Sequence, residues 1–235
     1  MPTSSSIELK SRDGRDLHGV LTLPPGSAGK NRPGVVQVNF RGSGGYGWAF
    51  MELGKRQWGR TMQDDVTDAT RWAIAQGIAD AKRICIYGAS YGGYSAMMGP
   101  IREPGLYQCA IGRSGAFDLA KLYKWGSIRR SELGLKYLKY VLGEDPVELA
   151  ANSPAQHADK IGLPVLLAHG TLDARVDIKH AKLMARELAK RKQSVELIEY
   201  SSTGHSVVLD RHRLDLYTRL LAFLDQHLGA APVSE

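Results

Sequence analysis

Residues 84–93 read ICIYGASYGG, and this stretch decides the fold. A short apolar run rich in isoleucine ends in the pattern G-x-S-x-G, and small residues then lead into a helical stretch from about Tyr91. A strand that turns sharply into a helix needs small residues on both sides of the turn, and it exposes the side chain at its tip. The stretch therefore predicts a strand, a tight turn carrying Ser90, and a helix. The alternative is a glycine-rich turn in which the serine is incidental.

Further apolar stretches of strand length follow along the chain, and amphipathic stretches separate them. Strands are predicted at 35–40, 84–87, 109–111, 163–168 and 195–200, and helices at about 60–76, from 91, within 118–142, at 178–191 and at 208–228. Strands that alternate with helices indicate a parallel sheet with right-handed crossovers, and strands that are apolar throughout indicate helices on both faces. Residues 7–23 predict an antiparallel hairpin around Asp13-Gly14, followed by a Pro/Gly/Ser-rich loop at 24–33. Residues 1–235 are expected to form one domain.

Composition limits the classes of protein to which the chain can belong. Its 43% hydrophobic content is ordinary for a packed globular domain, and no apolar run reaches the length of a membrane span. The N-terminus lacks the features of a signal peptide, so a cytoplasmic protein is expected, or an exported one if a longer N-terminus precedes Met1. Lysine and arginine number 31 against 24 acids, but they are interspersed with acids on helical stretches, which favours a solvated face over nucleic-acid binding.

The two cysteines, Cys85 and Cys109, both lie in apolar stretches of strand character. Free cysteine is among the most buried residue types, and two cysteines do not make a disulfide-based scaffold. We therefore expect two buried free thiols.

A serine hydroxyl is a weak nucleophile and needs a base within hydrogen-bond reach, itself oriented by an acid. When the serine lies at a turn of this kind, the acid and the base follow in the order Ser, Asp, His. Asp173 lies in the loop after the strand at 163–168, and His205 lies in the loop after the strand at 195–200. Both loops leave the carboxyl ends of strands, where open α/β sheets place their sites. The sequence thus predicts a triad of Ser90, Asp173 and His205, with the Tyr91 N–H at the helix N-terminus as an oxyanion donor.

Competing acids and histidines fit the triad less well. Asp177 is interpreted as an N-cap or first-turn acid of the helix at 178–191, and Asp210 is expected to start the final helix. His169 is interpreted as a structural hydrogen-bonding residue. Four further histidines lie on or beside predicted helices and are expected at the surface: His157, His180, His212 and His227.

Four segments together resemble the catalytic domain of the prolyl oligopeptidase family of serine peptidases, in particular its acylaminoacyl-peptidase and dipeptidyl-peptidase types. They are residues 39–47 (NFRGSGGYG), 88–94 (GASYGGY), 169–176 (HGTLDARV) and 204–205 (GH). The resemblance implies an α/β-hydrolase fold and cleavage of peptide or amide bonds in short peptides. It also implies that the phenol of Tyr46 is a second oxyanion donor, which suits a neutral O–H donor. Tyr94 and Arg113 are expected to line the substrate pocket.

The chain departs from the family pattern in three places. Nothing in it predicts the β-propeller that usually precedes the catalytic domain, so a stand-alone domain or a fragment is expected. A strand, a loop and a helix are missing between the loop at 24–33 and Asn39, so the sheet is expected to be one strand short beside the nucleophile strand. Ser206 follows His205 where glycine is usual.

The expected reaction is acyl transfer through an acyl-enzyme. Carboxylester hydrolysis by the same residues and a catalytically weak or inactive homologue are the alternatives, since the fold does not decide between them. No cofactor is expected, because the glycine-rich stretch at 42–47 lacks the Gly-Lys-Ser/Thr ending of a phosphate-binding loop. A small peptide or ester is the expected partner, without nucleic acid or membrane.

Overall fold

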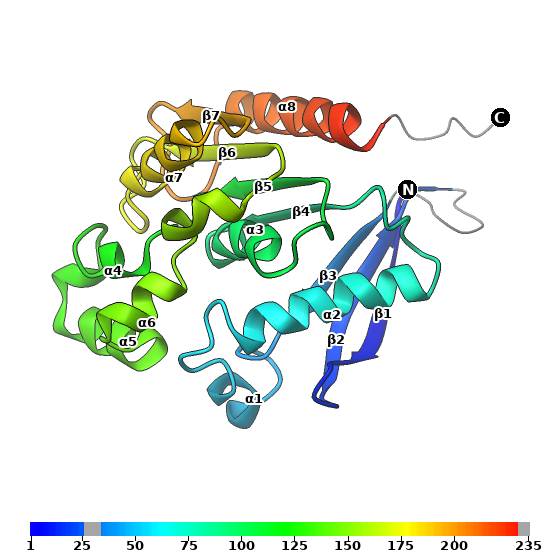
Figure 1. The fold of residues 1–235 in the computed structure, drawn as a ribbon, viewed down its shortest axis with the longest axis horizontal. Coiled ribbons are helices and arrows are strands. Elements are labelled where there is room, and N and C mark those ends of the chain that lie inside the picture. The colour runs from blue at the N-terminus through cyan, green and yellow to red at the C-terminus, as the bar shows by residue number, and fades with distance from the viewer. Residues whose placement is uncertain (26–33, 230–235) are drawn as a thin grey trace.

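The computed structural model describes residues 1–25 and 34–229 (Figure 1). Most of the loop predicted at 24–33 lies outside the described residues. The strands are β1 (Thr3–Lys10), β2 (Asp16–Leu23), β3 (Val35–Asn39), β4 (Cys85–Ala89), β5 (Cys109–Arg113), β6 (Val165–Gly170) and β7 (Val195–Tyr200). The α-helices are α1 (Trp48–Glu52), α2 (Thr61–Ala75), α3 (Tyr91–Arg102), α4 (Leu119–Leu122), α5 (Glu132–Leu142), α6 (Pro146–Ala151), α7 (Lys179–Lys190) and α8 (Asp210–Leu228). Two 3₁₀ helices are η1 (Ile128–Arg130) and η2 (Pro154–Lys160).

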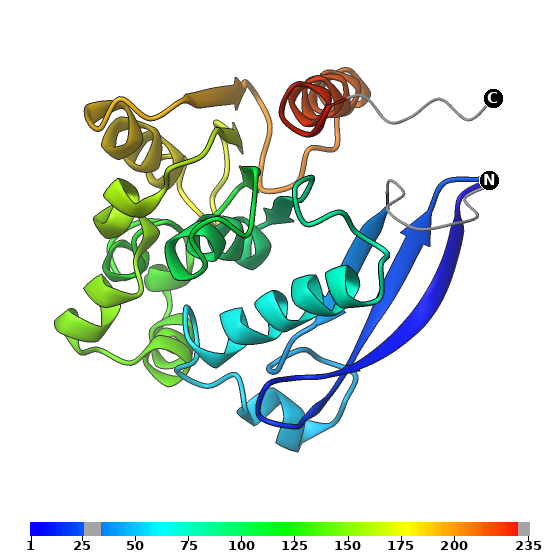
Figure 2. The same ribbon diagram turned by 45° about the vertical axis from the view of Figure 1, so that its right-hand side comes forward.

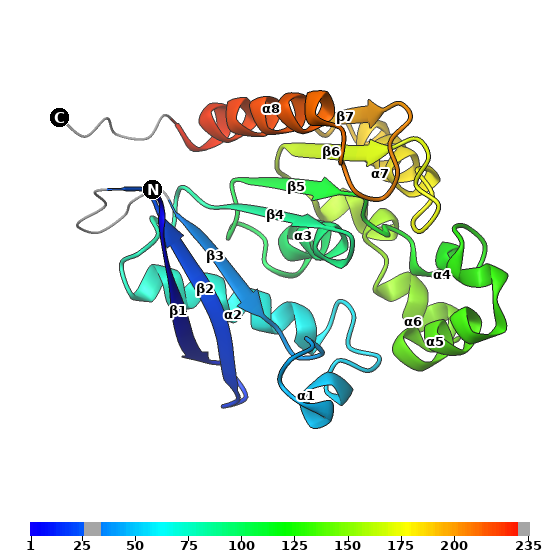
Figure 3. The ribbon, with the colours of Figure 1, turned by 180° about the vertical axis from the view of Figure 1, so that it is seen from behind.

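Strands β4 to β7 form a parallel sheet in chain order, as the alternating pattern predicts. Its two faces are covered by different helices, with α3 on one side and α8 on the other (Figures 1 and 3). Met97 of α3 and Met184 of α7 pack with Leu167 of β6 in one core cluster. Leu216 and Phe223 of α8 pack on the opposite face in a second cluster. Both faces are therefore buried, which explains why these strands are apolar throughout.

The N-terminal hairpin is confirmed. Strands β1 and β2 pair antiparallel, and β2 pairs antiparallel with β3 in a separate sheet. The turn of the hairpin is tied to α2 by Arg41, whose guanidinium donates to Asp13 and to the fully buried Asp65. A buried guanidinium satisfied by two carboxylates fixes this sheet against α2.

Within the described residues the two sheets do not join, so the nucleophile strand has a paired neighbour on one side alone, as the departure from the family pattern before Asn39 predicts. Within the described residues β3 pairs only with β2, and β4 pairs only with β5. Figure 2 shows the N-terminal strands, in blue, standing apart from the parallel sheet, with α2 (cyan) between the two layers. Among the residues that the structure describes, one edge of β4 is therefore unpaired next to Ser90.

This open edge predicts an alternating pattern of hydrogen exchange along β4. The Ser90 N–H donates to Arg113 O and Ile84 O accepts from Gln108 N–H, and successive residues of a strand point to opposite neighbours. Amides of Ile86 and Gly88 thus face β5, whereas those at 85, 87 and 89 face the open edge. We expect the three edge amides to exchange at least roughly tenfold faster in native-state exchange measured by NMR. Equal protection of both sets would show that another segment or a second copy covers this edge.

The two cysteines are paired, so the expectation of free thiols is wrong. Cys85 and Cys109 stand opposite each other in the register of β4 and β5, with their Cα atoms 4.7 Å apart, and the structure joins them in a disulfide. The sequence identified both strands but not their register, which is what brings the two sulfur atoms together.

Candidate active site

Ser90 lies at the tip of a strained turn between β4 and α3. Its backbone has φ 57° and ψ −117°, a conformation that non-glycine residues rarely adopt. A Cβ on Gly88 would collide with the backbone of Gly92, and a Cβ on Gly93 would lie 2.7 Å from Arg113 O. The strand, the turn and the helix can therefore approach closely only because these positions carry no side chain. The strain holds the hydroxyl above the end of the sheet.

The three residues predicted as a triad lie within hydrogen-bond distance of one another. His205 Nε2 is 3.0 Å from Ser90 Oγ, and His205 Nδ1 is 2.8 Å from Asp173 Oδ2. The side chain of His205 is 17% exposed and that of Asp173 is fully buried. The imidazole is thus partly open to solvent, whereas the carboxylate behind it is sealed from water.

Asp173 is held by four donors. Its Oδ1 accepts the backbone N–H groups of Arg175 and Val176, each at 3.0 Å. Its Oδ2 faces the ring nitrogens of His205 at 2.8 Å and of His169 at 3.1 Å. Burial alone would raise the pKa of Asp173, but the hydrogen bonds from His169, His205 and Val176 hold that pKa well below its usual range. The group is therefore a carboxylate at neutral pH.

The loop that carries His205 rests directly on the end of β6. A Cβ on Gly170 would collide with the carbonyl oxygens of Thr203 and Gly204, so glycine is required for this approach. Two side chains at the end of β5 hold the same loop: Arg113 Nη1 and Ser114 Oγ both donate to the carbonyl oxygen of His205 at 3.2 Å. Arg113 was expected in the substrate pocket, but the structure directs its guanidinium to the histidine loop.

The two expected oxyanion donors have different surroundings. The Tyr91 N–H is at the first position of α3, where a helix leaves its N–H groups without an intrahelical partner. The ring of Tyr46 stacks on His18 with centroids 5.1 Å apart, and its Oη accepts a hydrogen bond from Asn39 Nδ2 at 2.9 Å. Among the described residues the hydroxyl of Tyr46 is thus hydrogen-bonded to Asn39, and its role as an oxyanion donor at Ser90 stays a prediction.

An aromatic cluster surrounds the residue that follows the nucleophile. The ring of Tyr91 contacts Phe40 at 4.8 Å and the edge of Trp58 at 4.6 Å between centroids. Burial raises the pKa of the Tyr91 phenol above its ordinary value, and nearby Asp65 adds to this effect. Tyr94 is fully buried and donates its hydroxyl to Asn152 O at 2.9 Å. The structure thus places Tyr94 in the core and not on a pocket wall as expected, because the fourth residue after Ser90 faces inward from α3.

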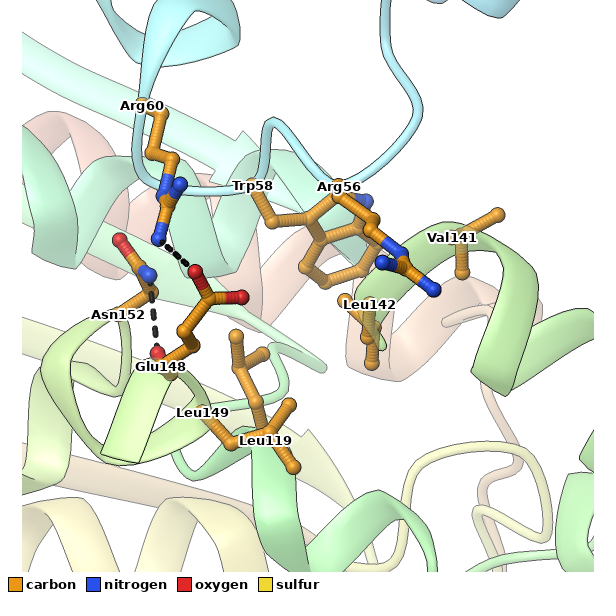
Figure 4. Close-up of a pocket in the computed structure, with 9 residues that line it drawn as sticks. All are labelled: Arg56, Trp58, Arg60, Leu119, Val141, Leu142, Glu148, Leu149 and Asn152. Atoms are coloured by element: carbon orange, nitrogen blue, oxygen red, sulfur yellow. Dashed lines mark hydrogen bonds and ion pairs between the residues drawn. The ribbon is translucent and has the colours of Figure 1, made fainter. Parts of the chain in front are cut away.

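A small pocket lies behind Trp58, between the loop before α2 and helices α4 to α6 (Figure 4). It is lined by Arg56, Trp58, Arg60, Leu119, Val141, Leu142, Glu148, Leu149 and Asn152. Arg60 and Glu148 form an ion pair across it at 2.9 Å. Trp58 both lines this pocket and contacts the ring of Tyr91, so it connects the pocket to the aromatic cluster.

The competing acids lie where the sequence places them, but one histidine does not. Asp177 Oδ1 accepts the Lys179 N–H at 2.9 Å before α7, and Asp210 begins α8. His180 was expected at the surface and is fully buried. It lies on the inner face of α7, which the sequence pattern did not distinguish from the outer one. His169 was recognised as structural, but its contact with Asp173 was missed, although its position four residues before that acid is a signal for it.

None of the helices in residues 1–25 and 34–229 combines the length and the apolar character that crossing a membrane requires. Over the same two ranges there is no cluster of three or more histidine, cysteine, aspartate or glutamate side chains placed to hold a metal ion.

Curated relatives of the chain are peptidases by name. It is 29% identical to "Dipeptidyl peptidase family member 6" of Caenorhabditis elegans over 83% of this chain and 27% of that protein. It is 28% identical to "Dipeptidyl aminopeptidase BIII" of Pseudoxanthomonas mexicana over 97% of this chain and 39% of the relative. That second alignment runs over 278 positions, more than the 235 residues of this chain, so the relative has residues without a counterpart here. The chain spans well under half the length of either relative.

Solved structures with the same fold also carry peptidase or hydrolase names. A puromycin-hydrolyzing peptidase of Mycobacterium tuberculosis superposes with a TM-score of 0.89 and 25% identity, over 99% of this chain and 40% of that one. An acylaminoacyl peptidase of Pyrococcus horikoshii has a TM-score of 0.87 at 21% identity, over 100% of this chain and 43% of that one. The second likeness shows the α/β-hydrolase fold alone.

The sequence of the domain also matches a family model. The model described as the prolyl oligopeptidase family matches residues 33–231, a range that contains the strained serine turn and the two loops that bring Asp173 and His205 to it. Because this match covers most of the sequence and includes every residue of the hydrogen-bonded triad, the chain belongs to the prolyl oligopeptidase family.

Proposed function

We propose that this protein is a serine hydrolase that cleaves peptide or amide bonds of short peptides through an acyl-enzyme. The observation that carries the proposal is the continuous hydrogen-bond chain from Ser90 Oγ through both nitrogens of His205 to Asp173 Oδ2, at 3.0 and 2.8 Å. Such a chain converts a weakly nucleophilic hydroxyl into an effective one.

Each residue has a distinct part in the proposed reaction. His205 Nε2 takes the proton of Ser90 as Oγ attacks the carbonyl carbon, and Asp173 stabilises the imidazolium that forms. His205 then gives this proton to the leaving amine, and the acyl group stays on Oγ. Water attacks the acyl-enzyme with His205 again as base, which releases the acid and restores Ser90.

The tetrahedral intermediate needs donors for its negative oxygen. The Tyr91 N–H is the first, since it lies at the helix N-terminus directly after Ser90. Tyr46 is the second donor proposed, because its hydroxyl accepts from Asn39 and keeps its own proton available to donate. Strand β3 and the loop that follows it reach the nucleophile turn through the contact of Phe40 with Tyr91, which supports a role for this loop.

The preference for peptides rests on the relatives. Two of them are named dipeptidyl peptidases or aminopeptidases, and one solved acylaminoacyl peptidase holds a peptide chloromethyl ketone, Z-Gly-Gly-Phe. Hydrolysis of small esters is chemically accessible to the same residues, because esters have the better leaving group. The proposed substrate is therefore a short peptide, with esters as the comparison.

A fluorophosphonate probe and a substrate panel test the proposal. We expect the probe to label the wild-type chain and to spare Ser90→Ala, with both proteins folded by circular dichroism. Aminoacyl and dipeptidyl anilides should then be hydrolysed by the wild type only. Hydrolysis of short-chain phenyl esters without any anilide cleavage would replace the peptidase by an esterase. A folded wild-type chain that is not labelled would overturn the hydrolase proposal.

A further inference from the structure

A second histidine contacts the carboxylate of the triad, at the same oxygen as His205. The imidazole of His169 is fully buried at the end of β6, and its Nε2 lies 3.1 Å from Asp173 Oδ2. The same nitrogen lies 2.8 Å from Val176 O, in the loop that carries Asp173. Oδ2 of Asp173 is therefore shared by two imidazoles, one facing Ser90 and one facing the core.

The partners of His169 settle where one of its protons lies. A carbonyl oxygen and a carboxylate oxygen both accept hydrogen bonds, so Nε2 must carry a proton; it donates to Val176 O, and Asp173 Oδ2 lies 3.1 Å from the same nitrogen. The other ring nitrogen, Nδ1, is buried and has no hydrogen-bond partner within the described residues. His169 is thus held in place through a single donor, and that donor ends on Asp173 and on its loop.

A further buried histidine, His180, lies near His169. It contacts the edge of the Trp125 ring at 5.2 Å between centroids. Burial lowers the pKa of His180 to about 3, and His169 contributes to this effect, so His180 is neutral in the ordinary pH range. His180 therefore brings no charge to the neighbourhood of His169 and Asp173.

The division of donors on Asp173 gives His169 a specific task. Oδ1 accepts two backbone N–H groups of its own loop, but these bonds still allow the carboxylate to rotate about Oδ1. Oδ2 is held by Nδ1 of the partly exposed His205, whose other ring nitrogen exchanges the proton with Ser90, and lies 3.1 Å from Nε2 of the fully buried His169. His169 is therefore the side-chain donor near Oδ2 that lies outside the path of the transferred proton, and it helps to keep the carboxylate in line with His205 Nδ1.

We propose that His169 is a positioning residue for the triad, donating from Nε2 to Asp173 Oδ2 so that the carboxylate stays ionised and aligned with His205. The inference rests on the proposed hydrolase function. It concerns the chemical step and not substrate binding, because His169 lies beneath the site and reaches it only through Asp173.

Three variants of His169 test this role after fluorophosphonate labelling of the wild type has established the hydrolase function. Glutamine places its amide N–H₂ near the position of Nε2 and keeps the donor, whereas leucine fills the space without one. We expect His169→Leu to lower kcat by roughly tenfold to a hundredfold with KM unchanged within about twofold, well below the ~10⁴-fold loss typical of replacing the triad acid itself. His169→Gln should stay within about threefold of the wild type.

The proton between His205 Nδ1 and Asp173 supplies a readout that a purely structural role would not move. Its downfield NMR resonance should persist in His169→Gln and shift or vanish in a folded His169→Leu. If the leucine variant does not fold, His169→Asn replaces it, since its shorter amide lies near Nδ1 and cannot reach Asp173. A folded leucine or asparagine variant with wild-type kcat and resonance would overturn the proposal, as would a folded glutamine variant as impaired as the leucine variant.

Discussion

Replacing Asp173 by asparagine is expected to lower kcat by roughly 10⁴-fold at neutral pH without unfolding the protein, the size of loss seen when a triad acid becomes an amide. The direction follows from the donors. Two backbone N–H groups face Oδ1, so the oxygen of the introduced amide takes that position and its N–H₂ group faces His205 and His169, which keeps its hydrogen bond to Val176 O. His205 Nδ1 must then accept, and its proton moves to Nε2, which faces Ser90 and can no longer serve as a base.

Asp177→Asn is the matched control for this change. Asp177 lies four residues further along, and its carboxylate caps the Lys179 N–H and pairs with Lys179 Nζ at 3.4 Å. This control should retain activity within about threefold, since a partly exposed pair of this kind contributes little. Steady-state kinetics on an anilide substrate, with circular dichroism of both variants, makes the comparison. A loss of less than tenfold in Asp173→Asn would remove Asp173 from the proposed triad.

Gly88→Ala is expected to destroy the serine turn, whereas Gly92→Ala is expected to leave it intact. A Cβ on Gly88 would collide with the backbone of Gly92, and neither segment can move without displacing β4 or α3. Overpacking against backbone costs about 3 kcal/mol or more, which lowers Tm by roughly 6 to 12 °C in a domain of this size. Ser90 would also leave its strained conformation, so fluorophosphonate labelling should fall by at least about a hundredfold.

The control belongs to the same G-x-S-x-G pattern. A Cβ on Gly92 would meet nothing within 4 Å, and Gly92 lies in the first turn of α3. Alanine is favoured over glycine in a helix by roughly 1 kcal/mol at most, so Gly92→Ala should keep labelling and hold or raise Tm. Thermal melting and the labelling rate of the two variants decide the point. Equal damage by both substitutions would show that the turn is not packed as described.

The local elements and the order of the catalytic candidates could be read from the sequence. Apolar strands, amphipathic helices and turn dipeptides are properties of neighbouring residues, so β4, α3 and the hairpin around Asp13-Gly14 were predicted within a few residues of their bounds. The glycines of the serine turn and the loops that carry Asp173 and His205 are local features too. The missing strand beside β4 was predicted in another way, from the comparison of the chain with the pattern of the prolyl oligopeptidase family.

Contacts between distant segments were decided only by the tertiary structure. The register of β4 against β5 pairs Cys85 with Cys109, and the packing of α3 against the core buries Tyr94. The periodicity of neighbouring residues specifies neither the register nor the buried face. The sequence singled out Arg113 and His169 as candidate residues. Which atoms their side chains contact depends on how loops from different strands pack together. The sequence by itself therefore determined which catalytic groups this protein carries. Only the packing of β5, β6 and their loops decided that Arg113 and Ser114 bind the backbone of His205 and that His169 contacts Asp173. The physical reason is that hydrogen bonds act over about 3 Å, whatever the separation of the two residues in the sequence.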